Sequence, residues 1–171
     1  VESTTAGLTE LLYSDEIAIQ LHKMGFKAVM TEGAKHILSW KSPNYVYSSS
    51  AAPKLKVLLR NTTLSDELAF HFSDSTWHNF PMDAEKFATT LATLPEEEQV
   101  VNICVGAETF GIRQSAASGI FDFLKALPYY AMEQEMGFMT PSEVAKKFAA
   151  SDAVVVPYPL RWAGEGKDLS T

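Results

Sequence analysis

The chain has 171 residues, which suits one domain or one piece of a larger one, and 46% of them are hydrophobic, enough for a packed core. Its formal net charge of −7 argues against a nucleic-acid partner, because phosphate binding requires a basic face. No apolar run approaches the roughly 18 residues of a membrane span, so we expect no membrane interaction and take residues 1–171 as a single domain.

The first part of the chain alternates helical and extended patterns. Ser14 or Asp15 can cap a helix that ends at Gly25, and apolar residues at i, i+4 and i+7 fall on one of its faces. A strand is predicted over residues 26–31, followed by a short helical turn over residues 34–38.

The middle of the chain begins with residues typical of loops, which continue up to Pro53. Residues 56–60 predict a second strand, and Ser65 is expected to cap a short helix. Asp83 then begins a longer helix with an apolar stripe, and Pro95 ends it.

A third strand is predicted over residues 100–105. Ser115 or Ser118 is expected to open the next helix, which Pro128 should end. The run Thr140-Pro141-Ser142-Glu143 is a capping box with proline at the first helical position, so a further helix should start there.

The last strand is predicted over residues 153–156, which gives four strands separated by helices. This alternation indicates the α/β class, with a parallel sheet and flanking helices. Four strands are too few for the usual eight-stranded barrel. The sequence therefore predicts either a small open sheet or part of a barrel.

Two acidic residues follow predicted strands, at the edge where parallel α/β folds bind ligands. Glu32 directly follows the strand over residues 26–31, and Gly33 after it permits a sharp turn. Glu32 could face a cleft, or it could cap the next helical turn. Glu108 follows the third strand, and it is either a reactive acid or a hydrogen-bonding scaffold.

Other catalytic patterns are missing from the sequence. The four histidines lack metal-ligand spacing, and we predict neither a metal site nor a cofactor. The single cysteine, Cys104, is interpreted as a small core residue, and one cysteine excludes a disulfide within the chain. That cysteine usage favours a reducing compartment, so we predict a cytoplasmic location.

Aromatic residues beside polar loops form a further group of candidates. Their flat apolar faces with polar edges suit sugar rings, although each could simply be a packing residue. The group comprises Trp40, Tyr45, Tyr47, Trp77 and Trp162.

Several stretches, in order along the chain, match one known family. They are Met24-Gly25-Phe26-Lys27-Ala28-Val29-Met30-Thr31-Glu32-Gly33-Ala34, Trp40-Lys41-Ser42-Pro43-Asn44-Tyr45, Leu64-Ser65-Asp66-Glu67-Leu68-Ala69-Phe70, Glu108-Thr109-Phe110-Gly111 and Thr140-Pro141-Ser142-Glu143-Val144. From about Leu11 onward the chain resembles the α-amylase branch of glycoside hydrolase family 57.

The resemblance implies a retaining α-glucan hydrolase, with a glutamate nucleophile and an aspartate acid/base on an incomplete (β/α)7 barrel. The family's Thr-Glu nucleophile motif matches Thr31-Glu32, so Glu32 takes the nucleophile's role. The substrate-binding residues expected on this basis are Trp40, Asp66, Phe110 and Trp162.

The chain also departs from the family. The acid/base string Met-Asp-Tyr-Glu-Thr-Phe-Gly is here Val105-Gly106-Ala107-Glu108-Thr109-Phe110-Gly111, so Gly106 stands at the aspartate position. Gly111-Ile112-Arg113-Gln114 replaces Gly-Glu-His-Gln, and Gly164-Glu165-Gly166-Lys167 replaces an acidic stretch. Glu108 is expected to be a supporting acid whose side chain leaves the backbone away from the aspartate position.

A retaining mechanism needs two carboxyl groups roughly 5 Å apart, and loss of the proton donor removes on the order of 10²–10⁴ in rate. We therefore expect an amylase-like protein with weak or no hydrolytic activity, whose partner is an α-glucan or a maltooligosaccharide. The alternatives are a non-catalytic α-glucan-binding or regulatory protein, and part of an active enzyme completed by strands from elsewhere. Open sheet edges would favour self-association.

Overall fold

The computed structural model describes residues 3–162, which fold as two compact units. The sheet unit comprises residues up to 62 together with 99–102 and 139–162. The helical unit comprises residues 63–98 and 103–138. The single domain expected over residues 1–171 stays a prediction.

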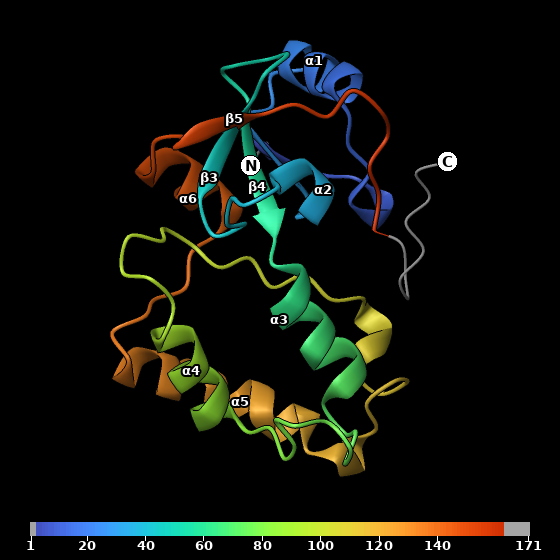
Figure 1. Ribbon diagram of the computed structural model, residues 1–171, viewed down its shortest axis with the longest axis vertical. Helices are drawn as coiled ribbons and strands as arrows, with labels where there is room; N and C mark the ends of the chain where they lie inside the picture. Colours follow the sequence, from blue (N-terminus) through green and yellow to red (C-terminus); the bar gives the residue numbers. More distant parts are fainter. Residues whose placement is uncertain (1–2, 163–171) are drawn as a thin grey trace. The chain divides into compact units, whose positions relative to one another are not determined.

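The sheet unit contains a five-stranded sheet with the order β1-β2-β4-β3-β5. Its strands are β1 (Thr5–Gly7), β2 (Ala28–Glu32), β3 (Val46–Ser49), β4 (Lys56–Arg60) and β5 (Asp152–Val154). Strands β1, β2 and β4 are parallel, whereas β3 runs antiparallel to β4 and parallel to β5. The predicted α/β class with a mostly parallel sheet is therefore confirmed (Figure 1).

Helices cover both faces of this sheet. They are α1 (Asp15–Lys23), α2 (Lys35–Leu38) and α6 (Pro141–Lys147), with a 3₁₀ turn at Thr9–Leu11. Because strand side chains alternate between faces, Val57 packs into the core that α1 and α2 complete, while Leu58 packs with Val144 of α6. The Lys56 ammonium donates to the carbonyls of Ala145 and Phe148, which ties the end of α6 to β4.

Two strands of the sheet were not expected, and one expected strand is not there. The sequence analysis missed β1 and assigned β3 to a loop, while residues 100–105 form only an isolated bridge, between Asn102 and Arg60. The reason is that β2 and β3 already occupy the two edges of β4. Since β3 pairs no further along β4 than Leu58, only the end of β4 remains available to residues 99–102.

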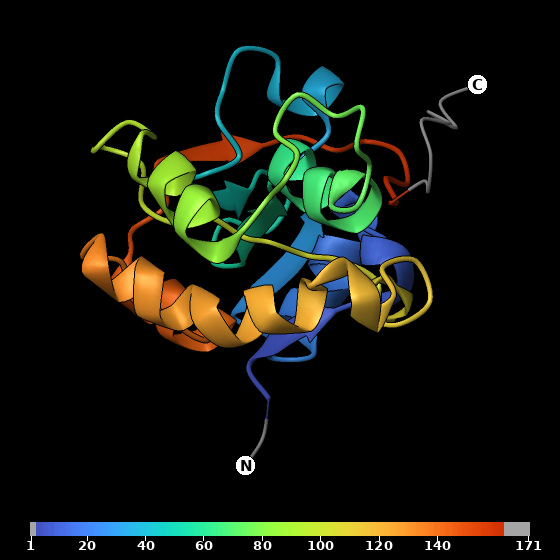
Figure 2. The same cartoon turned by 90° about the horizontal axis from the view of Figure 1, so that it is seen from below.

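The helical unit is built around two neighbouring helices, α4 and α5, which lie side by side in Figures 1 and 2. The Phe123 ring of α5 packs edge-on against Phe72 and Phe87, with centroids 5.3 and 5.5 Å away. The helices of this part of the chain are α3 (Thr62–Asp66), a π-helical turn (Glu67–His71), α4 (Ala84–Ala92), 3₁₀ turns (Ala107–Thr109 and Ala116–Ser118) and α5 (Ile120–Glu133).

Two helix boundaries differ from expectation. Pro128 lies inside α5 and does not end it. A proline leaves the carbonyl four residues earlier without its helical donor, and here both Pro128 and Leu124 are exposed, so water can serve that carbonyl. Ser65 does not begin a helix either, because its buried hydroxyl accepts a bond from the Cys104 amide. Cys104 itself is only half-buried.

Three predicted helix starts are confirmed, and each has a side-chain cap. The Ser14 hydroxyl accepts a bond from the Ile17 amide, and the Asp83 carboxylate accepts one from Lys86 at 2.8 Å. Thr140 and Glu143 form both bonds of the capping box. Among residues 3–162, no helix is long and apolar enough to cross a membrane.

The turn after β2 depends on the absence of a side chain at Gly33. A Cβ atom built there would lie 2.2 Å from the backbone carbonyl oxygen of Arg60 and 3.2 Å from Cβ of Pro43. The neighbouring end of β4 therefore passes too close for any residue but glycine.

Gly33→Ala should destabilise the protein by roughly 1–3 kcal/mol, the cost of overpacking a tight site. Denaturant unfolding followed by circular dichroism measures the change. Gly7→Ala is the matched control within the sheet unit, since a Cβ atom at Gly7 would have no neighbour within 4 Å. Equal unfolding midpoints for the two variants would contradict the close approach of Arg60.

Asp83→Ala should cost about 1 kcal/mol, because it removes the N-cap of α4. Glu85→Ala removes a carboxylate from the same helical turn without removing a cap, so it controls for the loss of charge. Thermal unfolding of both variants tests the cap, and an equal shift for both would assign the effect to charge alone.

Candidate functional site

The candidate site lies where β2 and β4 end together in the sheet unit. Glu32 is the last residue of β2, Arg60 is the last residue of β4, and the two are register partners in this parallel pair. Register partners on adjacent strands point to the same face of a sheet. The strand ends therefore bring a carboxylate and a guanidinium together.

Glu32 is held by three neighbouring groups. Its Oε1 accepts bonds from the Thr62 hydroxyl at 2.5 Å and the Gly33 amide at 3.0 Å. Arg60 Nη1 lies 3.2 Å from Oε2 and 3.4 Å from Oε1. Thus Oε1 has three donors, whereas the bond from Arg60 is the one that Oε2 accepts within the described part of the chain.

The ion pair is largely removed from water, since the exposed fraction is 0% for the Arg60 side chain and 9% for that of Glu32. A buried charge requires a partner, because removing one member of such a pair costs about 3–5 kcal/mol. The Arg60 guanidinium also lies over the Trp162 ring, 5.1 Å from its centroid. The carboxylate is therefore held in one position by a buried cation.

Asparagine side chains form hydrogen bonds beside the end of β4 in the sheet unit. Asn61 Nδ2 donates to Asn44 Oδ1 at 3.0 Å, and Asn102 Nδ2 donates to the Leu59 carbonyl at 2.9 Å. These bonds fasten the loop segments around the ends of β3 and β4. Across residues 3–162, no group of three or more His, Cys, Asp or Glu side chains is arranged to hold a metal ion.

The two aromatic residues expected to bind sugar in the sheet unit lie in different settings. Trp162 is half-buried against Arg60, and its amide donates to the Glu10 carbonyl. Trp40 is 89% exposed, in the loop that follows α2. Of these two, Trp162 is the residue that the fold brings to the Glu32–Arg60 pair.

Gly106 and Glu108 belong to the helical unit, where the 3₁₀ turn Ala107–Thr109 connects them. Although Glu108 is two residues further on, its carboxylate folds back over Gly106. A Cβ atom built on Gly106 would lie 2.2 Å from Glu108 Oε1 and 2.3 Å from Oε2. Glu108 thus fills the space in which a side chain at position 106 would begin.

Asp66 and Phe110, the remaining predicted sugar contacts, are half-buried in the helical unit. Asp66 ends α3, and Phe110 forms an isolated bridge with Gln114. Beside Asp66, burial raises the pKa of the Glu67 carboxyl, while His78 and His71 oppose that shift.

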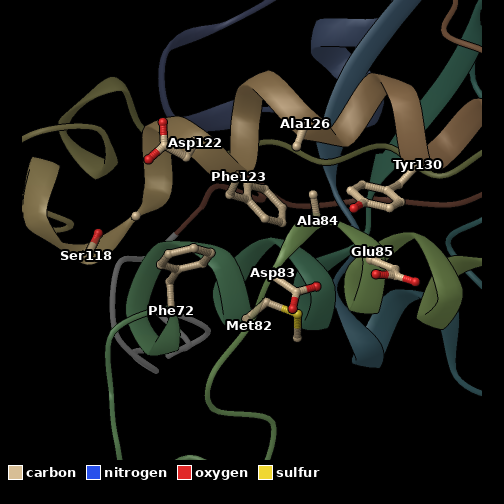
Figure 3. Close-up of a pocket in the computed structure, with 11 residues that line it drawn as sticks. Phe72, Met82, Asp83, Ala84, Glu85, Ser118, Asp122, Phe123, Ala126 and Tyr130 are labelled. Carbon is tan, nitrogen blue, oxygen red and sulfur yellow. The ribbon is translucent and has the colours of Figure 1, made fainter.

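A cavity of about 390 Å³ also lies in the helical unit, between α4 and α5. Figure 3 shows Asp83, Glu85 and Asp122 around the rings of Phe72, Phe123 and Tyr130. None of the residues predicted to act on or bind substrate lines this cavity.

The sequence analysis missed Arg60 and Thr62 as members of the site. The available signal was Arg60 itself, a charged residue at the end of the apolar strand over residues 56–60. A buried cation at a strand end requires an acidic partner nearby. The pairing of β2 with β4, which makes Glu32 that acid, is a tertiary property.

Comparisons with known proteins agree on one family. The sequence pattern of the family described as Glycosyl hydrolase family 57 matches residues 1–157. A protein of Methanocaldococcus jannaschii named "Putative alpha-amylase" is 39% identical over 165 residues, which make up 95% of this chain and 34% of that protein. The chain thus spans about a third of the length of this relative.

A crystal structure of 4-alpha-glucanotransferase from Thermococcus litoralis is similar, with a TM-score of 0.65 and 17% identity. The match covers 91% of this chain and 24% of that one, and at this identity it shows the shared fold. Because the family pattern extends over residues 1–157 of 171, this chain belongs to glycosyl hydrolase family 57.

Proposed function

We propose that this chain acts on α-glucans by retaining glycosidase chemistry, with Glu32 as the nucleophile and with weak hydrolytic activity. The observation that carries the proposal is the fixed carboxylate at the end of β2. Three donors hold Oε1, which leaves Oε2 as the oxygen better able to attack an anomeric carbon.

A nucleophile of this kind must point in one direction. The buried guanidinium of Arg60, the Thr62 hydroxyl and the Gly33 amide together hold the Glu32 carboxylate in one orientation. Attack forms a glycosyl ester at Glu32 and expels the leaving oxygen, which requires a proton. Gly106 cannot supply that proton, which is the reason for proposing weak hydrolysis.

The proposed substrate is an α-glucan or a maltooligosaccharide. The relatives' names, an alpha-amylase and a 4-alpha-glucanotransferase, support this class. Trp40 offers an exposed indole face suited to a sugar ring. Trp162, Asp66 and Phe110 remain proposed contacts on the strength of the family resemblance.

A non-catalytic α-glucan-binding or regulatory protein is the second candidate. Gly106 favours it, because a glycine at the acid/base position removes turnover without removing a sugar-binding surface. The two candidates differ in one respect, which is whether Glu32 forms a covalent bond to substrate.

Two further expectations stay predictions. The edge strands β1 and β5 have three residues each, so self-association through the sheet edges would rest on short pairings. A cytoplasmic location rests on cysteine usage alone.

Release of fluoride from α-maltosyl fluoride tests the nucleophile. Fluoride leaves as an anion and needs no proton donor, so the chain should release it despite Gly106. Glu32→Gln should reduce release to the uncatalysed rate, while Glu16→Gln, on the exposed face of α1, should leave it unchanged. Equal rates for the two variants would disprove attack by Glu32.

Loss of activity in Glu32→Gln must be separated from loss of the fold, since Arg60 would lose its counterion. Thr62→Val keeps the ion pair and removes the hydroxyl that donates to Oε1 and to the Gly33 carbonyl. This variant should fold and should release fluoride more slowly than the parent. Mass spectrometry of the parent treated with a 5-fluoro-α-glucosyl fluoride should locate the trapped sugar on the peptide that contains Glu32.

Amylose affinity electrophoresis tests the exposed tryptophan. Trp40→Ala should weaken retardation by amylose several-fold, because stacking on a sugar ring is lost. Met24→Ala removes a comparably exposed apolar side chain from the same unit and should bind as the parent does. Unchanged retardation of Trp40→Ala would remove Trp40 from the glucan site.

A further inference from the structure

We infer that the outward side of α5 is a self-association surface, on which a second copy of this chain docks its own α5 in antiparallel orientation. The surface belongs to the helical unit alone, and it does not depend on the proposed function. It is also separate from the edges of the sheet, where the sequence predicted self-association.

One side of α5 is already occupied within the helical unit. Ile120, Phe123 and Ala131 are buried there. The Phe123 ring packs edge-on against Phe72 and Phe87, and Figure 3 shows it projecting from α5 toward the neighbouring helices. This side is the apolar stripe by which a surface helix attaches to its own core.

The opposite side of α5 is apolar as well, although it is exposed. Its residues, here called the outer face, recur at i, i+3, i+7, i+8 and i+11 and are Phe121, Leu124, Pro128, Tyr129 and Met132. The exposed fraction is 62% for Tyr129 and 70% for Met132. A surface helix carries polar residues on this side, so an apolar patch here marks an interaction surface.

Charged residues are few along the whole helix. Of the 14 residues of α5, the charged ones are Asp122, Lys125 and Glu133. A helix that is apolar nearly all round is normally covered on every side. The helical unit covers one side of α5, and the outer face still requires a partner.

The positions of the charges indicate which partner fits. Lys125, Tyr129 and Glu133 follow one another at i, i+4 and i+8, so they lie along one flank of the outer face. A second α5 that crosses near Tyr129 in antiparallel orientation brings Lys125 of each copy to Glu133 of the other. A parallel second copy sets like charges against each other. The outer face is therefore complementary to itself in the antiparallel orientation.

Both charges are available for this contact. Lys125 Nζ lies 3.6 Å from Asp122 Oδ1, but the two side chains are 79% and 87% exposed, so this pair is weak and leaves the ammonium open to a second acid. Glu133 is exposed at the C-terminal end of α5, where a negative charge opposes the helix dipole. The last turn of α5 has no basic residue, and Lys125 of the second copy supplies one.

The size of the surface sets the strength of the dimer. A helix of 14 residues is about 21 Å long. One face of it is small beside the roughly 1,600 Å² of a standard stable interface. Because the dimer is two-fold symmetric, each contact occurs twice. We therefore expect a weak dimer whose population rises with protein concentration.

Sedimentation velocity of the full chain, from low micromolar to millimolar concentration, tests the outer face. The parent should change from monomer to dimer over this range. Met132→Asp should raise the dissociation constant by about tenfold or more, because it buries an unpaired carboxylate at two symmetric places. Met24→Asp is the matched control, since Met24 is 71% exposed in the sheet unit, and it should dimerise as the parent does.

Exchange of the two charges tests the antiparallel orientation. Lys125→Glu and Glu133→Lys should each weaken the dimer several-fold, because each variant sets like charges together at two places. The double variant should recover most of the parent's affinity, since its pairs are reversed but kept. Lys146→Glu, at an exposed position of α6, makes the same change in net charge as Lys125→Glu and should have no effect.

Three results would overturn the inference. A chain that is monomeric at every concentration would leave the outer face to a different partner. A dimer that Met132→Asp does not weaken would place self-association elsewhere, such as the sheet edges. A double charge variant that dimerises no better than either single variant would exclude the antiparallel pairing. Release of fluoride by Glu32 is measured separately, so none of these results decides the proposed function.

Discussion

The buried pair of Arg60 and Glu32 is the interaction on which the sheet unit depends. The fully buried Arg60 guanidinium requires an acidic partner that is also buried. The parallel register of β2 and β4 places Glu32 beside it. The same approach of the strand ends leaves no room for a side chain at Gly33. One ion pair therefore constrains the register, the turn after β2 and the start of α3, where Thr62 binds the same carboxylate.

This ion pair combines a structural role with the catalytic role proposed for Glu32. A buried ion pair often contributes little net stability compared with apolar residues, yet it is costly to break. In the proposed function, the pair holds the Glu32 carboxylate in one orientation. The unequal bonding of the two Glu32 oxygens follows from that geometry, since the amide and the hydroxyl both bind Oε1.

Two departures from the family, Gly106 and Arg113, lie beside the same side chain in the helical unit. Read along the sequence, Gly106 removes a carboxylate and Arg113 removes a histidine, and the two losses look unrelated. In the fold, both changes meet at Glu108, one by opening space and the other by adding a cation.

The sequence by itself determined the features that arise within a few residues: the helix starts near Ser14, Asp83 and Thr140, the strand 56–60, and the family. Only the tertiary structure decided which strands pair: β3 lies along β4, and residues 100–105 contribute the bridge between Asn102 and Arg60. It also decided the partners of Glu32 and the place of the Glu108 carboxylate. Caps depend on neighbouring backbone groups, whereas strand edges, buried counterions and vacated space belong to residues that meet only when the chain folds.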